Sequence, residues 1–182
     1  MGVKVVGLGG CGRNSLNALI DLGFDSSCAL NIDTDINAKS ASAAPFLQIG
    51  SAVCHGRGAV EPSVGLAAAK ESEDAIVKEL SGAEVLIFIA GLGGGTGAGA
   101  LPFIVSLVSV KTTVLAVMPA KIEGNRRRAR AEAALANFRA AVGKDNVHVI
   151  EMAEGTPATI FDRTDKTVAG KIKALLAGSP AS

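Results

Sequence analysis

Short, mostly apolar runs alternate along the chain with longer segments in which apolar and polar residues recur at helical spacing. Each run has four to six residues, and most of the runs end at glycine or polar residues. This pattern is typical of strands buried on both faces of a sheet. We therefore predict strands over residues 3–8, 28–32, 46–49, 85–90, 113–117 and 147–150.

The longer segments predict helices. Pro62 lies near the start of one helix and Pro102 in the first turn of another, where a missing backbone N–H leaves no hydrogen bond unmade. The predicted helices span residues 11–22, 62–80, 99–110, 124–142 and 164–176. Apolar strands separated by helices form parallel sheets covered on both faces. The predicted fold class is α/β, a doubly wound, mostly parallel, Rossmann-like sheet with helices on both faces.

The length of the chain fits a single domain. It has 182 residues, 48% of them hydrophobic, and one domain takes roughly 100–200 residues. We see no linker and no internal repeat. We expect one domain over residues 1–177 and a disordered tail at 178–182, where the helical pattern stops.

Composition argues against several classes of partner. The net charge of +1, and the 3% of aromatic residues without Trp or Tyr, argue against a nucleic-acid-binding surface. The apolar runs are too short to cross a bilayer, so we expect no membrane insertion. The three cysteines lack CxxC spacing, so we predict no metal site and no disulfide framework. With no signal-peptide pattern, a cytoplasmic location is expected.

A first chemical motif, GLGGCG at residues 7–12, lies between a predicted strand and a predicted helix. It fits G-x-G-x-x-G, in which glycines let backbone N–H groups approach a phosphate and the helix N-terminus attracts negative charge. Asp33 or Asp35 follows the second strand, about 20 residues on, where a ribose-binding acid is expected. Taken alone, the motif fits both a dinucleotide site and a glycine-rich turn without a ligand.

A second glycine-rich segment, GLGGGTGAG at residues 91–99, follows the strand predicted at 85–90. Glycines at this density leave a row of backbone N–H donors that can bind an anion, and Thr96 adds a hydroxyl. Two such loops at different strand ends suggest a triphosphate held from both sides. No G-x-x-x-x-G-K-[ST] sequence occurs, so the phosphates would be bound by backbone dipoles and helix ends rather than by a lysine.

Four segments of the chain resemble the FtsZ/tubulin superfamily, in that family's order and spacing. GGGTGAG at residues 93–99 is similar to the tubulin signature, and VVGLGGCGRNSLNALIDLG at 5–23 resembles the first nucleotide loop and helix of FtsZ. GRGAVEPSVGLAAAKE at 56–71 is similar to its third loop, and VMPAKIEGNRRRARAEAAL at 117–135 to its Pro-x-x-x-Glu-Gly-x-Arg-Arg segment. The resemblance is to the nucleotide-binding domain of an FtsZ-like protein that lacks the C-terminal domain.

This resemblance implies a site for GTP or GDP, with Mg²⁺ as a candidate companion of the phosphates. It gives Gly9, Gly10, Cys11 and Asn14 to the α- and β-phosphates and the base side, Gly58 and Ala59 to the loop at the γ-phosphate, and Gly93, Gly94, Gly95, Thr96 and Gly97 to the main phosphate cradle. It gives Glu123 to the ribose hydroxyls, Arg127 to the guanine and ribose, and Asp165 to the guanine N1 and N2 protons, with Pro119 and Asp33 completing the set.

Three features depart from the family pattern. Asp33 stands where the family has Asn, and its carboxylate would repel phosphates unless a metal or ribose hydroxyls satisfy it. Met152 falls near a guanine-side Asn and cannot hydrogen-bond a base. The chain contains no Asn-x-Asp-x-x-Asp sequence, which in the family belongs to the acidic synergy loop. We therefore assign no catalytic residue and expect slow hydrolysis.

The resemblance also implies partners. GTP would control assembly with itself or with an FtsZ-type protein through the nucleotide face, in cytoskeletal assembly or cell division. One alternative is an NAD(P)-binding Rossmann protein, which residues 7–12 and Asp33 support. Another is a non-catalytic regulator that caps a full-length FtsZ.

Overall fold

The computed structural model describes residues 2–152 and 155–178. Within them, the strands of one six-stranded sheet are β1 (Val3–Leu8), β2 (Ala29–Asp33), β3 (Phe46–Gln48), β4 (Val85–Gly91), β5 (Lys111–Val117) and β6 (Val147–Ile150). Their order is β3-β2-β1-β4-β5-β6, and every pairing is parallel. The predicted fold class is confirmed.

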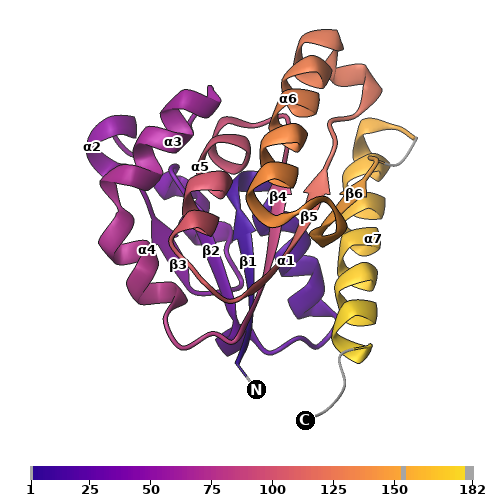
Figure 1. The fold of residues 1–182 in the computed structure, drawn as a ribbon. Coiled ribbons are helices and arrows are strands. Elements are labelled where there is room, and N and C mark those ends of the chain that lie inside the picture. Colours follow the sequence, from indigo (N-terminus) through magenta and orange to yellow (C-terminus); the bar gives the residue numbers. More distant parts are fainter. Residues whose placement is uncertain (1, 153–154, 179–182) are drawn as a thin grey trace.

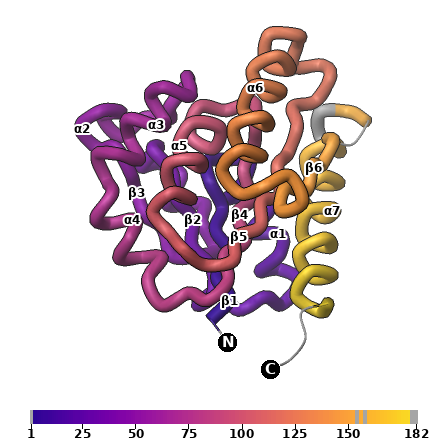
Figure 2. The backbone as a smooth tube through the Cα atoms, in the orientation of Figure 1, coloured from indigo at the N-terminus to yellow at the C-terminus, as the bar shows by residue number. Residues whose placement is uncertain are grey.

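Helices cover both faces of this sheet. They are α1 (Gly9–Asp21), α2 (Ser51–Cys54), α3 (Pro62–Glu71), α4 (Glu73–Leu80), α5 (Gly95–Ser106), α6 (Asn125–Val142) and α7 (Pro157–Ala177), with short 3-10 helices η1 (Ser26–Cys28), η2 (Ile36–Ala41), η3 (Lys121–Glu123) and η4 (Lys144–Asn146). In Figure 1, α3, α5 and α6 lie side by side over one face of the sheet. On the other face, α7 packs along α1 (Figure 2).

Two apolar cores hold these layers together. Phe88 of β4 packs in the core beneath α3, α5 and α6, while its neighbour Ile87 packs in the core beneath α1 and α7. Successive side chains of a strand point to opposite faces, so both kinds of position in β4 are apolar. This explains why the central strands appear in the sequence as continuous apolar runs rather than as an alternating pattern.

The strand order places two glycine-rich loops next to each other. β1 pairs with β2 on one side and with β4 on the other, with Gly7 opposite Ile89 and Leu8 opposite Ala90. After β1 the chain continues to β2 on one side, and after β4 it continues to β5 on the other side. In parallel sheets, ligands bind at such a switch point, beyond the carboxyl ends of the strands.

Helices α3 and α5 approach each other closely because glycines line their contact. A Cβ atom built on Gly99 would lie 1.9 Å from the carbonyl oxygen of Pro62, and one on Gly65 would lie 2.3 Å from the oxygen of Gly95. No real side chain fits at either distance. The first half of α5 is therefore packed directly against the start of α3.

Several predicted helix bounds were wrong. The helix predicted over 62–80 is interrupted at Ser72, whose hydroxyl accepts a hydrogen bond from the Gly50 N–H at 2.9 Å. α5 begins at Gly95, so Pro102 lies inside the helix and not in its first turn. Glycine disfavours helix, and this hid the true start. α7 also begins earlier, at Pro157 rather than Thr164.

The remaining expectations about chain ends and membranes are tested only in part. Of the tail expected at 178–182, only Gly178 lies within the described residues, where it ends α7. In the described part of the chain, no helix is both long and apolar enough to span a membrane.

Candidate functional site

A cavity of about 480 Å³ lies at the carboxyl ends of the strands, where the loops after β1, β2, β4 and β5 meet α7. Every residue assigned from the sequence lines it: Gly9, Gly10, Cys11, Asn14, Asp33, Gly58, Ala59, Gly93, Gly94, Gly95, Thr96, Gly97, Pro119, Glu123, Arg127 and Asp165. The structure thus brings the whole predicted set to one place. Their individual contacts with a ligand stay a prediction.

The two glycine-rich loops touch each other and both line this cavity. Gly9 opens α1 with a φ of +68°, a conformation that favours glycine, and a Cβ atom there would lie 3.3 Å from the Cβ of Thr96. Thr96 belongs to the first turn of α5. Two helix N-termini therefore border the same space, and both favour negative charge.

At Gly10 and Gly94, the fold leaves room for a side chain. A Cβ atom on Gly10 or on Gly94 would meet no atom within 4 Å, and neither residue has a positive φ. Gly12 is different, because a Cβ atom there would lie 2.4 Å from the oxygen of Ile89. Gly12 is required for close helix–strand packing, whereas Gly10 and Gly94 leave backbone exposed to the cavity.

A chain of hydrogen bonds ties the far loop of the cavity to its glycine cradle. The N–H of Ala59 donates to Thr34 Oγ1 at 2.8 Å, and the hydroxyls of Thr34 and Thr96 lie 3.0 Å apart. Thr96 in turn donates to Asp33 Oδ1 at 3.4 Å. All three contacts are satisfied together when Thr34 donates to Thr96. The loop at Ala59 therefore depends on the position of α5.

A salt bridge from α6 holds the same loop. Arg130 donates to the carbonyl oxygen of Val60 at 3.1 Å and to the carboxylate of Glu61 at 2.7 Å. Its side chain is only 20% exposed. The fold thus brings Arg130, from a helix rich in arginine, to a segment 70 residues away.

Asp33 is a buried carboxyl group in the wall of the cavity, with a side chain 6% exposed. Its Oδ1 accepts the N–H groups of Thr34, at 2.8 Å, and Asp35, at 3.4 Å. Burial raises the pKa of Asp33, and these two hydrogen bonds only partly oppose the rise. The side chain is thus partly satisfied by its own turn.

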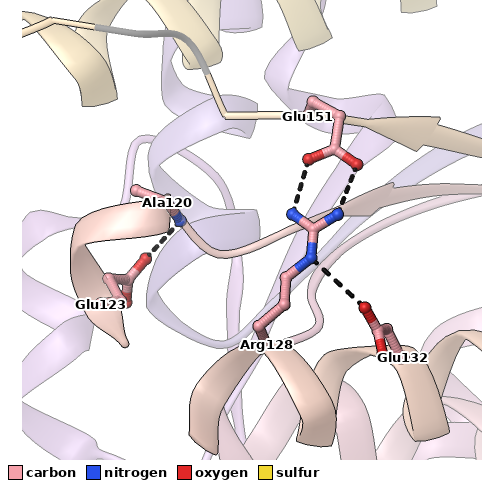
Figure 3. Close-up of polar contacts among 5 residues, drawn as sticks. All are labelled: Ala120, Glu123, Arg128, Glu132 and Glu151. Atoms are coloured by element: carbon pink, nitrogen blue, oxygen red, sulfur yellow. Dashed lines mark hydrogen bonds and ion pairs between the residues drawn. The ribbon is translucent and has the colours of Figure 1, made fainter. Parts of the chain in front are cut away.

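The segment after β5 places Glu123 and Arg127 at another side of the cavity. Figure 3 shows the Glu123 carboxylate accepting the Ala120 N–H, at 2.8 Å, which closes the 3-10 turn η3. Glu123 also forms an ion pair with Arg127. Arg128 is held instead by Glu151, at 2.8 and 3.1 Å, and by Glu132 (Figure 3).

Side chains from α1 and α7 form the opposite end of the cavity. Asp165 lies beside Phe161, one turn earlier on α7, and both line the space with Asn14 and Met152. Phe161 is 51% exposed, so its ring is accessible from the cavity that it lines. An exposed aromatic ring next to a carboxylate suits a flat, polar ring system.

Some lining residues were missed from the sequence. They are Leu8, Arg13, Ala38, Gly91, Val117, Met118, Phe161 and Thr164. Phe161 could have been found from its i, i+4 spacing to Asp165, but the helix was predicted to begin only at Thr164. Arg13 donates to Asn14 Oδ1 at 3.0 Å, so it orients an amide that was assigned. Thr34 and Arg130 gave no local signal.

Metal ligands were not found in the part of the chain that the structure describes. There, no group of three or more His, Cys, Asp or Glu side chains is placed to hold an ion. Mg²⁺ usually binds through substrate phosphates and one or two carboxylates. Asp33 is a carboxylate in the cavity wall that fits such a role.

The sequence of this chain is similar to that of known proteins. The model of the Tubulin/FtsZ family, GTPase domain, matches residues 2–151. Cell division protein FtsZ of Methanothermobacter thermautotrophicus is 40% identical over 153 residues, which are 81% of this chain and 40% of that protein. The chain therefore spans less than half the length of that relative.

Solved structures have the same fold. An empty FtsZ dimer from M. jannaschii matches with a TM-score of 0.86 at 27% identity, covering 95% of this chain and 53% of that one. CetZ2 from Haloferax volcanii, in a GTPγS-bound protofilament, matches with a TM-score of 0.83 at 22% identity, covering 97% and 58%. From its sequence match, and with the fold in agreement, the chain belongs to the Tubulin/FtsZ family and carries that family's GTPase domain.

Proposed function

We propose that this chain binds GTP and GDP in the cavity described above, as the nucleotide-binding part of an FtsZ-type cytoskeletal or cell-division protein. One observation carries the proposal. Gly10 and Gly94, from loops after neighbouring strands, expose their backbones to one cavity without any steric or conformational need to be glycine.

The proposed pose runs from one end of the cavity to the other. The base lies between α1 and α7, against Phe161, with Asp165 accepting its N–H groups and Asn14 beside it. The ribose lies near Glu123, since a carboxylate accepts two hydroxyl protons well. The phosphates lie between the two glycine loops, and the terminal phosphate reaches Gly58 and Ala59. Mg²⁺ would accompany the phosphates.

Assembly through the nucleotide face follows as part of this proposal. Gly58 and Ala59 line the cavity, and the next residue, Val60, is strongly exposed at its rim. A terminal phosphate at this loop would therefore lie close to any molecule that covers the cavity. The partner proposed is a second copy of the chain or an FtsZ-type protein, within the cytoplasm.

The proposal is tested by the nucleotide that co-purifies with the protein, identified by mass spectrometry after denaturation. Thermal unfolding with GTP, GDP and NAD adds an equilibrium measurement. A ligand present at about 100 times its Kd adds about 2.7 kcal/mol to the free energy of unfolding. We expect that increase from GTP and GDP. Stabilisation by NAD alone would support the alternative of a nicotinamide-binding protein and refute the GTP site.

A further inference from the structure

Ser15 connects the base end of the cavity to the core beneath it. Its side chain, on α1, is fully buried, and Oγ donates to Oδ1 of Asp165 on α7 at 2.5 Å. That distance is at the short end for a hydroxyl bound to a carboxylate. Ser15 itself does not line the cavity, whereas Asp165 does. A buried serine beneath the cavity thus contacts a side chain that lines it.

The charge state of Asp165 depends on what surrounds it. Burial raises the pKa of Asp165, and Asp162 on the same helix acts in the same direction, while the Ser15 hydrogen bond lowers it. On α1, burial and the nearby Asp165 and Glu123 raise the pKa of the Cys11 thiol to about 12, so Cys11 stays neutral. Of the cationic groups, Arg13 and Arg127 line the same cavity.

A carboxyl group that meets two N–H donors of one base must be ionised, because a protonated oxygen is itself a donor. It must also present both oxygens in the plane of the base. A buried hydroxyl on Oδ1 favours the ionised form and restricts rotation of the carboxylate. We propose that Ser15 is a positioning residue that keeps Asp165 ionised and oriented toward the two N–H donors of a guanine base. This inference rests on the proposed function.

The test compares GTP with inosine triphosphate. The base of inosine triphosphate keeps the ring N1–H but lacks the 2-amino group, so it offers Asp165 one of guanine's two donor groups. Dissociation constants are measured for both between pH 5.5 and 8 in the wild type, Ser15→Ala, Ser15→Thr and Ser15→Val. Thr and Val have the same shape and differ in the hydroxyl alone. They therefore separate loss of the hydrogen bond from a change in core volume.

We expect Ser15→Ala and Ser15→Val to bind GTP about tenfold more weakly, the effect of one hydrogen bond to a charged group. Inosine triphosphate should lose less, so that the ratio of the two affinities falls. Without the hydroxyl, the pKa of Asp165 rises, so GTP binding should begin to weaken at a higher pH than in the wild type. Ser15→Thr should restore both the ratio and the pH profile.

Two results would overturn the inference while leaving the proposed function intact. One is an unchanged GTP-to-inosine ratio and pH profile in Ser15→Ala. The other is an equal loss for both nucleotides without a shift in pH profile, which would mean that Ser15 serves packing only. Failure of the wild type to bind GTP is a different result, since it refutes the proposed function itself. Circular dichroism identifies any variant that does not fold, and Ser15→Ala removes the fewest atoms.

Discussion

At the scale of single residues, the cavity is distinguished by glycines that packing does not explain. Gly12 and Gly99 leave no room for a side chain, because backbone oxygens lie within 2.4 Å of the place for a Cβ atom. Gly94 has open space there and an extended backbone with φ −94° and ψ 164°. Any L-residue can adopt that conformation. A methyl group at Gly94 would therefore be tolerated by the fold and would enter the ligand space.

Gly94→Ala should separate binding from stability. We expect the free energy of unfolding to change by less than about 1 kcal/mol, as for a helix N-cap, and GTP affinity to fall about tenfold or more, which is about 1.4 kcal/mol. Chemical denaturation and titration calorimetry measure the two. Gly170→Ala is the matched control, since Gly170 also has open space but lies in α7 away from the cavity. The same GTP affinity in Gly94→Ala as in Gly170→Ala would contradict the proposed phosphate site at the glycine loops.

Asp33 is a carboxylate at a position where the family pattern has Asn. Its pKa is raised in the folded state, so the folded protein binds this proton more tightly than the unfolded chain. Its contribution to stability is complete below the ordinary pKa and is lost as the pH rises through the raised one. At neutral pH the carboxylate is therefore unfavourable both for folding and for phosphate binding.

Asp33→Asn should bind GTP about fivefold more tightly than the wild type in EDTA, because a like charge near the phosphates is removed. The amide oxygen can still accept the N–H groups of Thr34 and Asp35. Addition of Mg²⁺ should reduce the advantage, since the ion neutralises the same charge. Calorimetry in both buffers measures this, with the exposed Asp145→Asn as control. Weaker binding of Asp33→Asn in EDTA would show that the carboxylate contacts the ligand favourably.

At the scale of elements, the loop at residues 58–61 is held from two sides. Thr34, at the end of β2, accepts the Ala59 N–H, and Arg130 of α6 binds Val60 and Glu61. α5 lies between these attachments and packs against the same loop, since a Cβ atom on Gly95 would lie 2.3 Å from the Ala59 oxygen. The loop is therefore held by contacts with three separate parts of the fold.

Arg130→Ala should loosen this loop without unfolding the protein. Loss of contacts worth about 1–2 kcal/mol would raise the hydrogen-exchange rate of the Ala59 amide by about 5–30-fold. Amides of β4 should be unaffected. Arg126→Ala, an exposed arginine on the same helix, is the control. An unchanged exchange rate at Ala59 would show that Thr34 and α5 suffice to hold the loop.

At the scale of the whole molecule, the described residues supply a cavity that can hold a nucleotide, but no residue was assigned to activate water. We expect a polypeptide of these 182 residues to hydrolyse GTP at least about 100-fold more slowly than an intact FtsZ in the same buffer, the typical contribution of one general base. A multiple-turnover phosphate-release assay measures this, and GTP binding by the same sample is the control. Equal rates would show that this polypeptide carries its own catalytic group.

Local patterns were enough for the architecture and for most lining residues. The apolar runs predicted the strands to within a few residues, and the glycine-rich segments after them predicted both loops at the cavity. Helix starts were less predictable, because Gly95 begins α5 despite its low propensity. It does so where α3, at Gly65, and the Ala59 loop pack against it.

The contacts of Arg130 and Ser15 could not be predicted. Arg130 binds a loop 70 residues away, and Ser15 donates to a carboxylate 150 residues away. Neither spacing leaves a periodic trace in the sequence. Such contacts depend on how helices on the same face of the sheet come to lie side by side.

The order of apolar and glycine-rich segments can be read directly from the sequence. It was therefore enough to predict the parallel sheet, the two loops and the family. Local order does not state which loops face each other, or how deeply a side chain is buried. Only folding determines how deeply Asp33 is buried, which residue contacts Asp165, and which residues hold the Ala59 loop. These depend on solvent exclusion and long-range packing, which only the assembled sheet and its two helical layers provide.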